Sequence, residues 1–320
     1  MDLIYANSNK EDVGVMDSFK FDLAYGFDEN NFELSTGTNN HVCKEGFILY
    51  IEGTEYGGII EGIRVETEEN RIIYKGSTWH GLLDSKILEP DAGEDYLVLS
   101  GDANIVLASL IARMGLDDLF QVKDEASGLG ISNYSMNRYI EGYTGIKKML
   151  ATVNGKLKFN FENGHVLLWA EPLIDYSMDD EFDSDQINFV IEKNFIPINH
   201  VICLGQGDLK ERTVIHLYSD AAGNISKNQS FFGLEERTTT YENTNAGSAE
   251  ELEKEGIEAF EEMLNSDSLQ VSFDSTKDYD IGDIVGAREN TTGIFMARPI
   301  IKKIINIENN KIKVQHKVGE

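Results

Sequence analysis

The stretch Gly46-Phe47-Ile48-Leu49-Tyr50-Ile51 is rich in β-branched and aromatic residues, the residue types that favour β-strands. After a turn at Glu55-Tyr56-Gly57, the chain continues with Gly58-Ile59-Ile60-Glu61-Gly62-Ile63-Arg64-Val65. A second turn at Glu69-Asn70 leads into Arg71-Ile72-Ile73-Tyr74-Lys75. The segment predicts a three-stranded meander, and it makes the region of about residues 1–90 a β region.

The same order of features recurs near the end of the chain. Asp283-Ile284-Val285-Gly286-Ala287 precedes Gly293-Ile294-Phe295, and Lys311-Ile312-Lys313-Val314-Gln315 follows Asn309. Both copies have a strand, a Gly-Ile step into a long strand, an Asn-containing turn, and a strand that begins with a basic residue. Two hypotheses stay open here. Unrelated meanders resemble each other by chance, or the chain contains two related β-barrels.

Helical periodicity marks the middle region, at about 91–185. Asp102 is a candidate N-cap for a helix over Ala103–Met114, and Gly115 stands where a left-handed C-cap belongs. A second helix is expected over Thr144–Val153, and a β-hairpin over residues 156–170. The region therefore has mixed α and β character. It ends in an acidic run at 175–185, which we interpret as a linker or domain boundary.

The last region, about 186–320, is β again with one long helix. Ser248 and Glu251 have the spacing of a capping box, which predicts a helix over about 248–265. The expected strands are Asn188–Glu192, His200–Leu204, Thr213–Tyr218, Leu269–Phe273, Ile284–Ala287, Ile300–Ile305 and Lys311–Lys317. The fold class is thus a β-rich α+β chain of several domains.

Composition narrows the classes of function. The 320 residues include 28 Lys and Arg but 56 Asp and Glu, for a net charge of −28. Such a surface repels phosphate backbones and anionic lipid, so we expect no sequence-specific nucleic acid partner and no membrane insertion. Residues 1–7 lack the basic segment of a secretory signal, and no apolar run approaches the ~18 residues of a membrane span.

Motifs for catalysis, metals and cofactors are missing from the sequence. There is no P-loop and no nucleophile elbow, and Gly205-Gln206-Gly207 reads as a turn between strands. Cys203 lies in an apolar strand pattern typical of an inert thiol. The six histidines are scattered, and a structural role is expected for the four in or beside strand patterns, His165, His200, His216 and His316. The 175–185 run offers at most weak Ca²⁺ binding, as it lacks the EF-hand pattern. We therefore expect no enzyme, with no catalytic, metal or cofactor residues.

Three phrases, in this order, resemble a known family. Ser77-Thr78-Trp79-His80-Gly81-Leu82-Leu83-Asp84 closes the first meander. Gly205-Gln206-Gly207-Asp208-Leu209 comes next, followed by Arg212-Thr213-Val214-Ile215-His216-Leu217-Tyr218. The third is Tyr279-Asp280-Ile281-Gly282-Asp283-Ile284-Val285. Together they resemble the tail-tip (baseplate) hub proteins of long-tailed, siphophage-type bacteriophages and prophages of Gram-positive bacteria, over about residues 3–318.

The resemblance implies a hub with two similar β-barrels and small α/β insertions. It implies a first barrel at 1–90, the middle α+β region at 91–185, and a second barrel at 186–320 with the 248–265 helix inserted. It further implies a homotrimeric ring at the virion tail tip, made in the host cytoplasm. The expected partners are the tail tube and distal tail proteins above, and a fibre, spike or lysin below. DNA would pass through the ring, and an acidic lumen would not retain it.

Two other hypotheses remain. One is a carbohydrate- or receptor-binding tail module, although both tryptophans, Trp79 and Trp169, have apolar strand contexts that favour core packing. The other is a carboxylate-based cell-wall glycan hydrolase, which needs only two acidic groups at a separation that sequence does not define. Many relatives carry a cell-wall-cleaving extension. This chain ends after a strand-like segment, so we do not expect that activity here.

Overall fold

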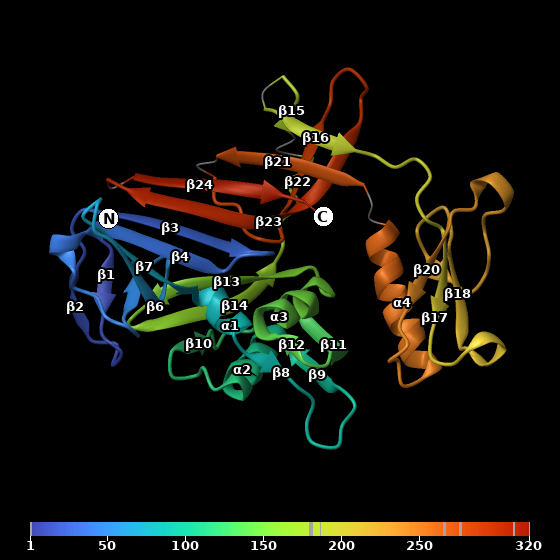
Figure 1. Ribbon diagram of the computed structural model, residues 1–320, viewed down its shortest axis with the longest axis horizontal. Coiled ribbons are helices and arrows are strands. Elements are labelled where there is room, and N and C mark those ends of the chain that lie inside the picture. The colour runs from blue at the N-terminus through green and yellow to red at the C-terminus, as the bar shows by residue number, and fades with distance from the viewer. Residues whose placement is uncertain are drawn as a thin grey trace. The chain divides into compact units, whose positions relative to one another are not determined.

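The computed structural model describes residues 2–178, 182–185, 187–264, 267–274, 277–309 and 311–319. The chain forms two compact units. Unit 1 comprises Met1–Asn188 and Val271–Gly319, and unit 2 comprises Phe189–Gln270 (Figure 1). The region boundaries expected near residues 90 and 185 stay predictions.

Unit 1 is built on one large sheet, to which the two ends of the sequence both contribute. Its strands run in the spatial order β21-β24-β23-β3-β4-β7-β6-β5-β1-β2, and β22 and then β15 flank β23. Their bounds are β1 Ile4–Ala6, β2 Asp12–Val15, β3 Phe19–Gly26, β4 Asn31–Gly37, β5 Ile48–Tyr50, β6 Gly57–Glu66, β7 Arg71–Thr78, β15 Phe182–Asp183, β21 Ser268–Asp274, β22 Ile284–Arg288, β23 Phe295–Glu308 and β24 Lys311–Val318. A short 3₁₀ helix, η1 (Thr38–Asn40), follows β4.

Both predicted meanders are present, and they share a plan. In the first, β6 pairs with β5 near its start and with β7 along its length, with a register shift between Ile60 and Gly62. In the second, β23 pairs with β22 and then with β24, with a register shift between Ile300 and Lys302. The turn before each third strand contains an asparagine with positive φ, Asn70 or Asn309.

The two closed barrels expected for regions 1–90 and 186–320 are not seen in this chain. Among the described residues, no sheet closes on itself. The physical reason is the length of β23. After its bonds to β22 end, its second half pairs with β24 on one side and, from Lys302 to Glu308, with β3 on the other. This pairing joins strands of both expected barrels into one open sheet.

The middle of the chain packs against this sheet (Figure 1). Its helix over Ala103–Met114 begins and ends at the predicted residues, with Asp102 accepting from the Asn104 amide and Gly115 at φ 67°. The second predicted helix occupies Gly142–Ala151. The elements are α1 Trp79–Asp84, β8 Ile87–Leu88, β9 Leu97–Asp102, α2 Ala103–Met114, β10 Phe120–Val122, β11 Gly130–Met136, β12 Ile140–Glu141, α3 Gly142–Ala151, β13 Gly155–Glu162 and β14 His165–Pro172.

Two hydrophobic cores of unit 1 are formed by described residues. One lies among the strands of the large sheet and contains Phe21, Phe32 and Ile305. The other lies between the sheet and the middle elements, and its largest member, Trp79, is fully buried. Burial of side chains of this size contributes about 1.5–3 kcal/mol each. Packing in these cores positions β13, which carries Lys156 and Lys158, relative to β23, which carries Lys303.

Unit 2 is a four-stranded sheet with one helix packed on it. The strand order is β19-β18-β17-β20. Val201, Cys203 and Leu217 face Leu252 and Phe260 of the helix. Ser248 caps the helix as predicted, accepting from the Glu251 amide at 3.1 Å. The elements are β16 Phe189–Glu192, β17 His200–Leu204, η2 Leu209–Glu211, β18 Val214–Ser219, β19 Ile225–Ser226, η3 Gly233–Glu235, β20 Thr238–Glu242 and α4 Ala249–Leu264.

The helix approaches the sheet closely at Gly256. A Cβ built there would lie 2.4 Å from the Cys203 sulfur, well inside van der Waals contact. Glycine is therefore required at this point of α4, despite its cost of about 1 kcal/mol in a helix. The Cys203 thiol is buried and its pKa is raised by burial, as expected for an inert strand cysteine.

Candidate functional site

A buried cluster of lysines and carboxylates lies in unit 1 where distant segments meet. Its first centre is Lys303 of β23, whose ammonium nitrogen lies 2.7 Å from Glu55, 3.4 Å from Asp280 and 3.6 Å from Asp278. Glu55 belongs to the β5–β6 loop, and the two aspartates belong to the segment between β21 and β22. Lys303 thus ties two loops to a central strand of the large sheet.

The second centre is Lys156 of β13. Its nitrogen donates to Asp280 at 2.7 Å and to both oxygens of Asp283, at 2.9 and 3.0 Å. Asp283 is fully buried and also accepts from the backbone amides of Ile174 and Asp280. Lys158, two residues along β13, donates to the other oxygen of Asp280 at 2.6 Å. Asp280 therefore links all three lysines.

The charges in this cluster stabilise one another. Burial alone would raise the pKa of Asp280, but the ammonium groups of Lys303, Lys158 and Lys156 hold the pKa of that carboxyl below its usual value. Burial alone would lower the pKa of Lys303, but Glu55 and Asp280 hold it above its usual value. Both groups stay charged at neutral pH, because each buried charge has an opposite partner in contact.

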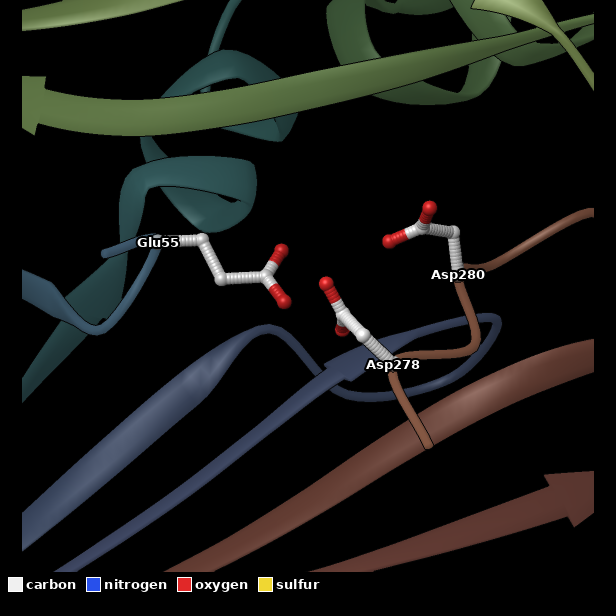
Figure 2. A group of neighbouring side chains, drawn as sticks. All are labelled: Glu55, Asp278 and Asp280. Carbon is white, nitrogen blue, oxygen red and sulfur yellow. The ribbon is translucent and has the colours of Figure 1, made fainter. Parts of the chain in front are cut away.

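Glu55, Asp278 and Asp280 have the spacing of a metal-binding group, and Figure 2 shows their carboxylates turned toward one another. The chemistry of the surroundings argues against a metal ion. Lys303 contacts all three carboxylates with its own positive charge. A divalent cation would have to displace a buried ammonium group that has no other acceptor among its described contacts. The arrangement is an internal salt-bridge network that clamps the fold.

A cleft of about 570 Å³ opens beside this network. Its lining includes Tyr56, Lys158, Trp169 and His316. Trp169 was expected in the core, but it is only partly buried, with Lys123 3.3 Å above its ring. Burial and the nearby Lys303 charge lower the pKa of His316 to about 4. The cleft combines an indole with charged and neutral polar groups, a combination suited to a polar ligand.

The acidic run begins beside this network: the amide of Ile174, the residue before the run, donates to Asp283, and Asp175 forms a β-bridge with Ile284. Gly205-Gln206-Gly207 forms the predicted turn, between β17 and β18. In the acidic run, hydrogen bonds from the Ser177 side chain and backbone amide lower the pKa of the Asp175 carboxyl. Residues 179–181 lie outside the described residues. The expectation of no catalytic, cofactor or metal residues stays a prediction. Among the described residues, no helix combines the length and hydrophobicity needed to cross a membrane.

The network is formed by residues that are far apart in the sequence, and local sequence patterns do not reveal it. The one available signal was the phrase Tyr279-Asp280-Ile281-Gly282-Asp283, whose two aspartates flank an apolar residue and a glycine. Its partners, Lys156 and Lys158, are two residues apart on a strand of the predicted hairpin and so share one face of it. Nothing in the local pattern places that face against residues more than 120 positions away.

Comparison with known proteins relates this architecture to one class. No model of a known protein family matches the chain, and no curated protein matches it in sequence. The 43 kDa tail protein of prophage MuSo2 from Shewanella oneidensis matches 99% of this chain with 98% of its own, at 11% identity and a TM-score of 0.56. Prophage tail protein gp18 from Listeria monocytogenes matches 99% of this chain with 94% of its own, at 11% identity and a TM-score of 0.54.

A chain of the phage P2 baseplate in its activated conformation is similar as well, at 10% identity and a TM-score of 0.50. The alignment covers 100% of this chain and 98% of that one. These structural neighbours are phage tail and baseplate proteins. The chain has the fold of that class, from end to end.

Proposed function

We propose that this protein is a structural component of a phage-type tail, and specifically the tail-tip hub of a siphophage-type phage or prophage of a Gram-positive bacterium. The observation that carries the proposal is the extent of the fold likeness, which covers almost the whole of this chain and of the tail proteins it resembles. A likeness that included only one unit would support a shared module. End-to-end likeness supports, by analogy of fold, a shared place in an assembly.

The proposed hub is a homotrimeric ring in the virion tail tip, made in the bacterial cytoplasm. Two meanders of the same plan in each chain support this arrangement, since three copies would present six similar edges to a hexameric tail tube. In this proposal the tube and distal tail proteins bind on one side and a fibre, spike or lysin binds on the other. The two open meanders complete barrel-like units only within the assembled ring.

The charge of the chain supports passage of DNA through such a ring. With 56 acidic against 28 basic residues, the surface offers few cations to a phosphate backbone. Each Lys or Arg contact to phosphate would slow a moving strand, and an acidic lumen avoids such contacts. The buried lysines of the network are matched by carboxylates, so they add nothing to the charge that DNA would meet.

The first test is the absolute mass of the purified protein by light scattering, over a wide range of concentration. A species at three times 35.9 kDa, with a central hole in electron micrographs, is the expected result. The measurement is repeated at about 0.15 M and 1 M salt, because self-repulsion at a net charge of −28 opposes assembly and salt screens it. A monomer in every condition, also when mixed with tail-tube protein, would contradict the hub.

A second candidate function is binding of a cell-wall glycan in the cleft beside the network. The observation in its favour is Trp169, which lines the cleft, whereas Trp79 is fully buried. A glycan that enters the cleft should change tryptophan fluorescence in the wild type but not in Trp169→Phe, where only the buried Trp79 emits. Equal fluorescence with and without wall glycans would exclude this function. A zymogram that cleared would instead favour the glycan hydrolase.

A further inference from the structure

Two histidines of unit 2 face each other on the side of the sheet that α4 does not cover. Strands β17 and β18 are antiparallel, with His200 opposite Tyr218, so that His216 lies diagonally across from His200. Val201 and Leu217, the alternate residues, point into the core under α4. His200 Nε2 and His216 Nδ1 are 2.9 Å apart. Because successive strand residues alternate sides, both imidazoles lie on the outer face.

A carboxylate orients the inner histidine of this pair. His200 Nδ1 lies 2.7 Å from Glu236 Oε1 and 3.0 Å from Thr238 Oγ1. A carboxylate accepts only, so the proton of that contact belongs to His200 Nδ1. In the neutral ring, Nε2 then carries a lone pair that points at His216. His200 is buried and its ring stacks on Tyr218, which fixes its orientation, whereas His216 is exposed.

We propose that His200 and His216 bind a divalent transition-metal ion, of which zinc is the reference case. The ion would take the place of the proton that the two imidazoles now share. Two nitrogens bound to tetrahedral zinc lie about 3.3 Å apart, given Zn–N bonds of about 2.0–2.1 Å. The two rings therefore need to separate by only a few tenths of an ångström from the 2.9 Å contact, and the exposed His216 can move.

The surroundings favour this class of ion over others. Imidazole nitrogens suit zinc, copper and nickel, while calcium and magnesium prefer oxygen ligands. A metal-binding histidine almost always donates its other ring N–H to a carboxylate or carbonyl, which is the contact that Glu236 makes with His200. Water would fill the remaining positions of the ion. The cluster at Glu55 differs, because its cation is the protein's own Lys303.

The inference is tested by calorimetric titration of the full chain with zinc chloride, and it stands apart from the tail-hub proposal. We expect one ion per chain, bound in the micromolar range. His216→Ala removes an exposed ligand and should weaken binding at least tenfold. Glu236→Gln keeps both ligands but weakens the orienting contact, and it should weaken binding about tenfold.

His41→Ala is the matched control, since His41 is also exposed but its described ring contact is with Tyr74 and not with a second imidazole, and the variant should bind zinc like the wild type. Circular dichroism confirms that each variant is folded. Copper(II) provides a second readout, because its electron paramagnetic resonance spectrum should show coupling to two nitrogens in the wild type and one in His216→Ala. Zinc binding that is absent, or equally strong in the wild type and His216→Ala, would overturn the proposal.

Discussion

The two units contain charged clusters that differ in one respect, access to water. In unit 1, Lys156 and Asp283 are buried and each finds its counter-charge inside the protein. In unit 2, the Glu236–His200–His216 chain begins at a partly buried group and ends at an exposed one. The first cluster holds segments together. The second has an open end at which an ion can exchange.

This difference shows how burial decides what a polar cluster can do. A buried charge in a low-dielectric interior is tolerated only when it is fully paired, so its partners are fixed and cannot also serve a ligand. An exposed imidazole exchanges protons and ligands at little cost, because water solvates every state. Variants that alter access or pairing therefore test the comparison directly.

The largest decrease in the free energy of unfolding of unit 1 is expected for Asp283→Asn. The change removes the charge that pairs with Lys156 and leaves a buried ammonium with Asp280 as its main partner. Breaking a buried pair in this way costs about 3–5 kcal/mol in free energy of unfolding. Both tryptophans lie in unit 1, so urea unfolding followed by tryptophan fluorescence reports this unit alone.

The matched control is Asp278→Asn in the same network. Asp278 lies 3.6 Å from Lys303, but 79% of its side chain is exposed. Asp278→Asn should lower the free energy of unfolding by less than about 1 kcal/mol, the value typical of solvent-exposed ion pairs. Equal losses for Asp283→Asn and Asp278→Asn would mean that burial does not set the strength of this network.

The second prediction concerns how the stability of unit 1 depends on pH. The pKa of the buried His316 is lowered to about 4, mainly by burial and then by Lys303, with Asp278 and Glu55 acting in the opposite direction. The unfolded state, with a histidine pKa of about 6.5, therefore binds the proton first. Stability is fully present above pH 6.5 and is lost as the pH falls from about 6.5 toward about 4.

His316→Phe removes this titrating group and keeps the ring that stacks on Phe273. The unfolding free energy of the wild type should fall by about 3 kcal/mol more than that of the variant across the same pH window. Above pH 7 the difference between the two proteins should be constant, which provides an internal reference. Parallel curves down to pH 4 would show that His316 is not held neutral by burial.

The locally encoded parts of the fold were predictable. Helix α2 follows from Asp102, its apolar spacing and Gly115, and α4 from Ser248 and Glu251, because caps and periodicity act within a few residues. The meanders follow from alternating strands and turns. Helix α1 was missed, since six residues carry too little periodicity to distinguish them from a strand end.

Long-range pairing was not predictable. The bond pattern between β3 and β23 joins residues such as Asp22 and Asn306, and no local signal specifies that partner. The same holds for the salt-bridge network, in which Lys156 meets Asp283 across 127 positions. For the histidine pair, the sequence predicted two neighbouring strands but not their register. One residue of slip would have placed His216 on the opposite face.

A smaller loss of stability is expected for Lys158→Met, because its partner in the network, Asp280, also contacts two other lysines. Lys158 donates to Asp280, which also contacts Lys156 and Lys303. The remaining two ammonium groups keep Asp280 paired, and the methionine retains the apolar stem that lines the cleft. We expect a loss of about 1.5 kcal/mol in free energy of unfolding, at the lower end of the range for one hydrogen bond to a charged group. A loss as large as that of Asp283→Asn would show that Lys156 and Lys303 do not compensate for the missing contact of Lys158 with Asp280.

The smallest change in stability is expected when the exposed ion pair between Lys227 and Glu253 in unit 2 is broken. The nitrogen and oxygen are 2.8 Å apart, yet the side chains are 62% and 30% exposed. Glu253→Gln should change stability by less than about 0.5 kcal/mol, because water and side-chain entropy offset most of the attraction. It also removes one negative charge from the acidic helix α4, so the sign can reverse in favour of the variant.

Unit 2 contains no tryptophan, so hydrogen exchange of amides in α4 and β17 is the appropriate measurement for this pair. Any difference between Glu253→Gln and the wild type should disappear at about 1 M salt, where the screening length falls to about 3 Å. The loss for Asp283→Asn should persist at the same salt, because ions do not reach a sealed pair. A loss above about 1 kcal/mol for Glu253→Gln, unchanged by salt, would remove the distinction between the two clusters, since a solvated pair would then be as strong as a buried one.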